Sequence, residues 1–280
     1  MPGTERPSLC PACGQLVCVG VTHCSRCGAN LTFSPAAVAR SARRFVPSEY
    51  PVTAVLLGMN AVIFVITTLL GSLGRQGLVG SFLAGAPFVW TMTGAFAQSV
   101  LAGEWWRLVV PMFVHGGLMH VAFNSMALAD LGPAVEHNYG SARYLFLYVV
   151  TGILGFGASV AWSLITGTPH LSVGGSGAVL GIVGVLLAIT VKRGGVFMER
   201  VRAQLLRSIG YTFLLGVVIN VDNAAHVGGL AAGFVLGMAM KDRPPATPAG
   251  RNVAVGLGTG AALAVVAAFV ALAVHLIARG

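Results

Sequence analysis

The sequence has few charged residues, and acidic ones are especially scarce. Only 9% of its 280 residues are Asp, Glu, Lys or Arg, whereas 56% are hydrophobic and the mean hydropathy is +0.83. A soluble domain carries about a quarter charged residues. This composition therefore excludes an ordinary soluble protein and predicts an all-α polytopic membrane protein.

A formal net charge of +9 would ordinarily suggest a nucleic-acid partner. The basic residues, however, lie in short clusters between apolar runs, so we predict no nucleic-acid partner. The chain also shows no tandem repeat and, in its first 30 residues, no apolar signal segment. We therefore expect the first membrane span to start insertion without being cleaved.

A membrane-spanning helix needs about 20 mainly apolar residues. Seven runs meet this requirement approximately, and the fifth of them is the shortest: 52–71, 118–136, 144–165, 174–191, 207–221, 224–240 and 252–277. Basic clusters before the first span, after the fourth and after the sixth all fall on one side. The positive-inside rule then places the N-terminus in the cytoplasm and the C-terminus outside. The abundance of Ala, Gly and Val favours a bacterial inner membrane.

The segment 72–117, between the first two spans, is not a plain polar loop. Its apolar pieces are broken by Gly and Pro, and it carries the aromatic residues Phe82, Trp90, Trp105 and Trp106. Since Trp favours the membrane interface, we expect this segment to lie partly in the outer leaflet. The alternative is an additional short span, which would invert the topology of everything that follows.

Cysteine is absent after residue 27, and all five cysteines lie within residues 1–33. The pairs in "CPACG" and "CSRCG" predict a small zinc-ribbon-like module, because two CxxC turns can close a tetrahedral thiolate site. A cytoplasmic location disfavours disulfides. The expected ligands of a structural zinc ion are Cys10, Cys13, Cys24 and Cys27, with Cys18 and His23 spare. A redox-active or unstructured cysteine cluster is the alternative. Such a module is structural or binds a partner, here a cytoplasmic protein.

Composition divides the rest of the chain. A polar, basic, proline-containing linker is predicted at 34–51, and a six-helix core at 52–240. The sequence "KDRPPATPAGR" at 241–251 predicts a cytoplasmic linker, followed by a seventh transmembrane helix at 252–280.

Four polar side chains from three predicted spans fall at one depth in the membrane. Ser176 and His226 each lie about two residues into a span that starts from the same side, and His120 and Asn124 begin the second span at i and i+4 on one helix face. Ionisable residues inside a membrane are rare and usually functional. The shared depth predicts a polar site, although each residue alone is equally typical of helix packing.

These residue types fit acyl-transfer chemistry. A serine hydroxyl is a weak nucleophile until a base takes its proton, and His226 is the base candidate for Ser176. Gly229 and Gly233 would let their helix approach the glycine-rich helix of Ser176 closely. His120, Asn124 and the Ser176 N–H could stabilise an oxyanion. No carboxylate is well placed as a third member, since Asp222 lies in the outer loop and Asp130 lies deeper, so we predict a dyad that needs no cofactor.

Three stretches resemble the rhomboid family of intramembrane serine proteases: "EWWRLVVPMFVHGGLMHVAFN" (104–124), "GGSGA" (174–178) and "DNAAHVGGLAAG" (222–233). The resemblance covers about residues 52–240 and implies a six-helix rhomboid-like core with one additional C-terminal helix. It implies that Ser176 is the nucleophile, His226 the general base, and His120 and Asn124 the oxyanion-binding residues.

Supporting roles are also implied by this resemblance, for His115, Trp106, Arg107, Gly174 and Gly177. Glu136 and Tyr144 fall where the family often has an acidic residue and an aromatic residue on the cytoplasmic side. The sequence departs from the family at Leu180, because members often carry an aromatic residue there that packs on the catalytic histidine.

The implied reaction is hydrolysis of a peptide bond in the transmembrane segment of another protein, near its outer end, through an acyl-enzyme. The implied partners are transmembrane substrates and the lipid bilayer, and we expect the fifth span to act as a gate. The alternatives are a catalytically inactive protein that binds membrane clients, a transporter, and a zinc-sensing regulator. A transporter would need polar groups spread across the membrane, whereas here they gather at one depth.

Overall fold

The computed structural model describes residues 8–9, 16–17, 23–28, 49–74, 77–218 and 221–279. The chain divides into two compact units, Met1–Glu49 and Tyr50–Gly280. In the first unit, β1 (Ser8–Leu9) pairs with β2 (Leu16–Val17) in an antiparallel ladder.

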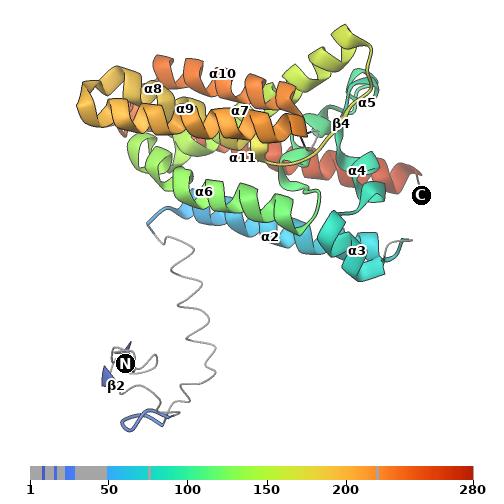
Figure 1. The fold of residues 1–280 in the computed structure, drawn as a ribbon, viewed down its shortest axis with the longest axis horizontal. Helices are drawn as coiled ribbons and strands as arrows, with labels where there is room; N and C mark the ends of the chain where they lie inside the picture. Colours follow the sequence, from blue (N-terminus) through green and yellow to red (C-terminus); the bar gives the residue numbers. More distant parts are fainter. Residues whose placement is uncertain are drawn as a thin grey trace. The chain divides into compact units, whose positions relative to one another are not determined.

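The second unit is a bundle of long helices (Figure 1), and each predicted span falls largely within one of them. The long helices are α2 (Pro51–Ser72), α6 (Leu118–Tyr139), α7 (Ser141–Thr166), α8 (Ser176–Arg193), α9 (Gly195–Val218), α10 (Asn223–Ala239) and α11 (Pro248–Arg279). Among the described residues, α2, α7, α8 and α11 are long and apolar enough to cross a membrane, and α10 is a shorter apolar helix. The all-α polytopic fold is thus confirmed.

Six of the seven helix starts differ from the predicted ones, and the differences at α8, α9 and α11 have a clear physical cause. Helix α8 begins at Ser176 and not at 174, because Gly174 has a φ of +122°, far from the negative φ of a right-handed helical turn. Helix α9 begins at Gly195, twelve residues before the predicted span, because hydropathy does not detect its polar and basic first turns. Helix α11 begins at Pro248, inside the predicted linker, since proline is tolerated in the first turn of a helix.

Helix α8 is the central helix of the bundle, and most of its side chains are buried against α7 and α10. Its contact with α10 is made backbone to backbone. A Cβ atom added at Gly229 would overlap the carbonyl oxygen of Gly177, and one added at Gly233 would overlap that of Gly181. Only glycine fits at these positions, and the two helices are therefore as close as their main chains allow.

The connection between α2 and α6 consists of short elements. They are α3 (Gly77–Ala84), α4 (Pro87–Thr93), β3 (Ala95–Phe96), α5 (Ala97–Leu101) and the 3₁₀ helices η1 (Trp105–Leu108) and η2 (Val110–Phe113). None of these described helices is long enough to cross a membrane, so an additional span is not found there. Strand β3 pairs with β4 (Leu171–Ser172), which joins this connection to the segment just before α8.

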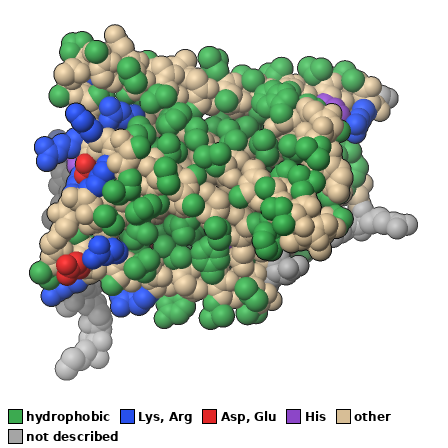
Figure 2. Space-filling model, turned by 90° about the horizontal axis from the view of Figure 1, so that it is seen from above, with side chains coloured by type: hydrophobic (Ala, Val, Ile, Leu, Met, Phe, Trp, Pro, Cys, Tyr) green, Lys and Arg blue, Asp and Glu red, His purple; other side chains and the backbone are tan. Residues whose placement is uncertain are grey.

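Lys and Arg side chains gather at one end of the bundle, visible at the left of Figure 2, while hydrophobic side chains cover the middle of that face. We call this the basic end. There Lys192 donates to the Gly237 carbonyl at 2.7 Å, and Arg193 pairs with Asp242 at 2.7 Å. Burial acts to raise the pKa of Asp242, but hydrogen bonds from Arg193 and from its own backbone, with the charges of Arg193 and Lys192, outweigh it and lower that pKa.

Glu136 ties three helices together near the basic end. Its carboxylate accepts hydrogen bonds from the Val52 and Thr53 N–H groups at 2.9 Å, from the Thr53 hydroxyl at 2.8 Å and from the Ser141 hydroxyl at 2.7 Å. The side chain is buried. Four donors compensate for removing this charge from water, and they fix the starts of α2 and α7 against the end of α6.

Replacing Glu136 with Gln should therefore destabilise the bundle. The amide is uncharged and turns an N–H toward existing donors, so we expect a loss of about 1.5–3 kcal/mol in the free energy of unfolding. Thermal unfolding in detergent measures this loss, with Glu199→Gln, at an exposed position on α9, as the matched control. Equal melting temperatures for the two variants would show that Glu136 does not hold these helices together.

Candidate active site

The candidate site lies where three parallel helices begin. His120 is near the start of α6, Ser176 is the first residue of α8, and His226 lies in the first turn of α10. Each of these helices starts at the end of the bundle opposite the basic end, which we call the active-site end. The sequence predicted that these residues lie at one depth in the membrane, and in the structure they lie in one layer.

Ser176 and His226 are joined by a hydrogen bond of 2.7 Å between Oγ and Nε2. The His226 side chain is buried, with a relative exposure of 3%. The distance lies within the range of about 2.6–3.2 Å needed for a histidine to take a proton from a serine hydroxyl. The close approach of α8 and α10 at their glycines makes this contact possible.

Among the residues that the structure describes, no carboxylate extends the pair. When Nε2 accepts from Ser176, the proton of a neutral His226 sits on Nδ1, and this atom has no hydrogen-bond partner among the residues that the structure describes. Asp222 instead accepts from the Ala225 N–H at 2.9 Å, capping α10, and its second oxygen lies 3.8 Å from His170 Nε2. Asp130 is exposed.

His120 lies against the glycine loop that precedes Ser176. Its Nδ1 accepts from the Gly116 N–H at 3.1 Å, so in the neutral ring the proton is on Nε2. A Cβ atom added at Gly174 would lie 2.6 Å from this Nε2. Glycine is therefore needed at 174 both for its positive φ and for the space of the ring. The Nε2–H donor therefore lies against Gly174, two residues before Ser176.

Two further donors lie near Ser176. Asn124 donates one amide hydrogen to the His120 carbonyl at 2.9 Å, and its second amide hydrogen remains available. Its Oδ1 would lie 3.7 Å from a Cβ atom at Gly175, so the amide lies beside the loop. The Ser176 N–H, at the first position of α8, has no partner within the helix. Together with His120, these groups can surround an oxyanion.

His115 supports this arrangement from below the surface. It is 1% exposed, its Nδ1 donates to the Phe113 carbonyl at 3.2 Å, and its ring meets that of His120 edge to face at 5.2 Å. The contact restricts the orientation of His120, and His115 itself makes no hydrogen bond to the described atoms of Ser176 or His226.

The predicted supporting residues Trp106 and Arg107 hold the α2–α6 connection and lie outside the Ser–His pair. Arg107 donates to the carbonyls of Thr91 at 3.0 Å and Gly94 at 2.8 Å and pairs with Glu104 at 2.5 Å. The Trp106 ring packs against His275 of α11, with 4.8 Å between centroids. In the same connection, the Pro111 carbonyl accepts from the Gly174 N–H at 2.9 Å, which fixes the loop before Ser176.

An aromatic contact to His226 was not anticipated from the sequence. Leu180, where the family often has an aromatic residue, is buried. Phe213 of α9 contacts the His226 ring instead, with 6.0 Å between centroids and an interplanar angle of 79°. Residue spacing along one helix carries no signal for this contact, because the ring comes from a different helix.

The structure describes two of the four predicted zinc ligands. Cys10 and Cys13 lie outside the described residues, while Cys24 is buried and Cys27 exposed. The described part of the chain holds no group of three or more His, Cys, Asp or Glu that could bind a metal ion. Around the second pair the backbone turns tightly, since the Gly28 N–H donates to the Cys24 carbonyl at 2.9 Å.

One known family model matches this chain, and the match covers about half of its residues. Residues 102–243 match the model of the Rhomboid domain. This range contains every residue of the candidate site.

Known proteins with similar sequences have related names. The chain is 39% identical over 149 residues to Rhomboid protease GluP of Bacillus subtilis, covering 52% of this chain and 28% of that protein. It is 32% identical over 191 residues to the Putative rhomboid protease YdcA of the same organism, covering 67% and 87%. RHOMBOID-like protein 4 of Arabidopsis thaliana is 35% identical over 157 residues, covering 55% and 39%. The chain thus spans well under half of two of these three relatives.

Substituting Gly233 should test whether the close helix contact is needed for the site. An alanine Cβ would overlap the Gly181 carbonyl, so α10 must move away from α8 and lengthen the Ser176–His226 contact. A misplacement of about 1 Å can cost about 100-fold in rate. We expect Gly233→Ala to slow labelling of Ser176 by a fluorophosphonate at least tenfold. Gly256→Ala on α11, where nothing lies within 4 Å of the added carbon, should label normally. Unchanged labelling of Gly233→Ala would contradict this reading.

Proposed function

The chain belongs to the rhomboid family, and on that premise we propose that it is an intramembrane serine endopeptidase that uses Ser176 and His226 as a catalytic dyad. The observation that carries the proposal is the 2.7 Å hydrogen bond between these two side chains from different helices. The roles implied by the sequence resemblance and the donors around Ser176 support it.

The chemistry follows from the geometry. Ser176 Oγ attacks the carbonyl carbon of the scissile peptide bond while His226 Nε2 takes its proton. The Ser176 N–H, His120 and Asn124 donate to the oxyanion that forms. His226 then gives the proton to the leaving amine, and an acyl-enzyme remains. His226 then takes a proton from a water molecule, whose oxygen attacks the ester carbon. As the bond from that carbon to Ser176 Oγ breaks, His226 gives the proton to Oγ and the free acid leaves. Every proton is accounted for, and no cofactor is required.

The proposed substrate is a transmembrane segment of another protein, cut near its end in the leaflet at the active-site end. A helix hides its peptide bonds in internal hydrogen bonds, so it must unwind locally before attack. Glycine or proline near the cleavage site would lower the cost of unwinding.

Helix α9 is the proposed gate. Among its described residues only Leu205 and Gly216 are buried, so the helix is held weakly against α8 and α10. Outward movement of α9 would open a path from the bilayer to Ser176. It would also withdraw the Phe213 ring from His226, so we propose that Phe213 positions the imidazole when α9 is closed.

We propose that the basic end faces the cytoplasm, as the positive-inside rule favours, and that the active-site end faces outward in a bacterial inner membrane. Reporter fusions at the C-terminus test this orientation, since a cytoplasmic C-terminus would contradict it.

Removing either member of the dyad should abolish activity. We expect Ser176→Ala and His226→Ala to lose both fluorophosphonate labelling and cleavage of a transmembrane model substrate, because loss of a nucleophile or its base costs several orders of magnitude in rate. Intact-mass analysis should show one adduct in the parent protein, located at Ser176.

An unlabelled but folded parent would contradict the proposal. It would favour the second candidate, a rhomboid-like protein that binds membrane clients without cutting them.

Truncating Phe213 should reduce turnover more than substrate binding. Aromatic pairs contribute about 0.5–1.5 kcal/mol beyond their buried area, so we expect Phe213→Ala to lower kcat by about 2- to 12-fold with little change in KM. Phe197→Ala, at an exposed position near the other end of α9, is the control. Equal kcat values for the two variants would remove the positioning role from Phe213.

We propose that the N-terminal unit binds one structural zinc ion through Cys10, Cys13, Cys24 and Cys27 and offers a surface to a cytoplasmic protein. The antiparallel pair β1–β2, which brackets the first CxxC, and the tight turn at Cys24–Gly28 support a ribbon-like site. Four thiolates suit a closed tetrahedral zinc site, whose role is structural.

Elemental analysis tests the zinc proposal. We expect about one zinc per chain in the parent protein, as for a four-thiolate site, and a loss of zinc in the Cys10→Ser/Cys13→Ser variant, with proteolysis unchanged. Zinc content that does not respond to the substitution would contradict the ligand set.

A further inference from the structure

An apolar cavity of about 690 Å³ lies between α2, α4, η2 and α11. It is lined from the second half of α2, from α4 and from the last turns of α11, so it lies at the active-site end. Its volume falls in the range of about 300–1,000 Å³ typical of sites that bind small molecules. It is separate from the Ser176–His226 pair, and neither of these residues lines it.

The cavity offers almost no hydrogen bonds to an occupant. Its two hydroxyl groups are used within their own helices, since Thr67 donates to the Phe64 carbonyl at 3.1 Å and Thr93 to the Val89 carbonyl at 2.8 Å. The remaining lining is aliphatic or aromatic, apart from Gly74. An occupant must therefore be apolar along most of its length.

The cavity is open toward the hydrocarbon of the bilayer. Two of its lining residues on α2, Ile66 and Leu70, are each about half exposed, and α2 and α11 are both apolar enough to span a membrane. An acyl chain of a surrounding lipid can thus enter from the side.

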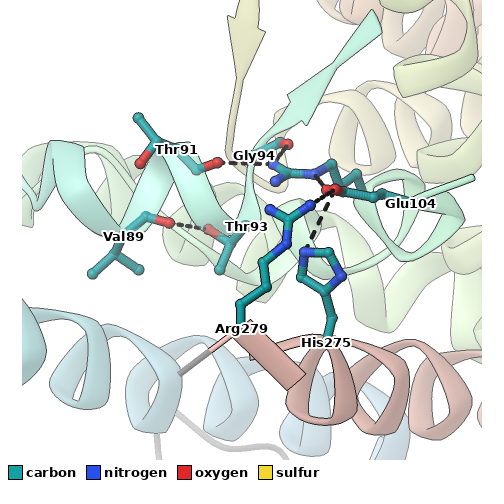
Figure 3. A network of polar contacts seen from close by, with 8 residues as sticks. Val89, Thr91, Thr93, Gly94, Glu104, His275 and Arg279 are labelled. Carbon is teal, nitrogen blue, oxygen red and sulfur yellow. Dashed lines mark hydrogen bonds and ion pairs between the residues drawn. The ribbon is translucent and has the colours of Figure 1, made fainter. Parts of the chain in front are cut away.

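A polar network lies close to two residues that line this cavity, Val89 and Thr93 (Figure 3). Arg279 and His275 point from α11 toward Glu104, with distances of 3.3 Å and 3.5 Å to the same oxygen, beside the Val89–Thr93 wall. Leu272, Leu276 and Arg279 follow at i, i+4 and i+7, so they share one face of α11. The cation therefore lies one turn beyond the apolar lining.

The charges of this network do not balance. Among the described residues, Glu104 is the single carboxylate paired with two guanidinium groups, and Arg107 already pairs with it at 2.5 Å from a buried position. Arg279 shares the other carboxylate oxygen, while its side chain stays 67% exposed. Arg279 thus has N–H donors and positive charge left for an anionic group at the membrane surface.

We propose that this cavity binds an anionic phospholipid, with one acyl chain between α2, α4 and α11 and with the phosphate on Arg279. Two lining residues lie at η2, Val110 as its first residue and Val114 just after its end, and the Pro111 carbonyl of η2 accepts from the Gly174 N–H. A bound lipid would therefore brace the backbone that positions the loop before Ser176. This inference does not depend on the proposed proteolysis.

Lipid retention by the full-length protein tests the proposal. The protein is washed free of lipid in detergent, supplied with palmitoyl-oleoyl phosphatidylglycerol or with dioleoylglycerol, and examined by native mass spectrometry. The parent should retain one molecule of whichever lipid is supplied. Ile66→Trp, which fills the cavity, should lose both lipids. Arg279→Gln should lower retention of phosphatidylglycerol alone, by about fivefold, as expected for one basic residue at a membrane surface, and Arg279→Lys should restore part of it.

Matched controls separate this site from ordinary boundary lipid. Leu69→Trp changes a lipid-exposed residue of α2 outside the cavity, and Arg251→Gln removes a cation from the other end of α11. Both should retain phosphatidylglycerol like the parent. Equal retention in all variants would overturn the proposal, and so would unchanged lipid retention in Ile66→Trp with weaker cleavage of a transmembrane substrate, because the cavity would then be a substrate groove.

Discussion

The contact between the α8 and α10 backbones is the constraint on which the site depends. The carbonyl oxygens of Gly177 and Gly181 occupy the volume where side chains at 229 and 233 would otherwise begin. In a bilayer the hydrophobic effect does not drive helices together, because lipid tails are as apolar as the helices. Close van der Waals packing must therefore hold the helices against each other. The same packing brings a hydroxyl and an imidazole from two helices within 2.7 Å. Stability and chemistry therefore rest on the same small residues.

A second set of contacts connects α11 to the loop before Ser176 and so helps to position this residue. The seventh helix reaches Glu104 through His275 and Arg279, Glu104 pairs with Arg107, and Arg107 holds the Gly94 carbonyl beside β3. Strand β3 pairs with β4, just ahead of the glycine loop. Glu104 and Arg107 are buried, and buried charges at membrane depth are costly unless they are paired, so this ion pair stays closed at the centre of the network. The C-terminal helix is thereby connected to the active-site end.

Much of this structure was predictable, and the failures have physical causes. Apolar run length located all seven helices, and matched depth brought Ser176, His226 and His120 together. Run length missed the first turns of α9, because Arg200 and Arg202 lower the local hydropathy although they do not disfavour a helix. The contact of Phe213 with His226 joins two different helices, and the pairing of β3 with β4 joins segments far apart in sequence. No local pattern encodes such contacts. The sites proposed for zinc and for catalysis stay predictions until they are measured.

The parallel course of α6, α8 and α10 has an electrostatic consequence. Each helix carries the equivalent of about half a positive charge at its N-terminus, and all three N-termini meet around Ser176. The field at the reacting carbonyl is thus supplied by peptide dipoles that are fixed before any substrate arrives. An ionised lysine or arginine in the same place would have to be desolvated. The fold instead distributes the required positive potential over backbone that the bilayer already obliges to be helical.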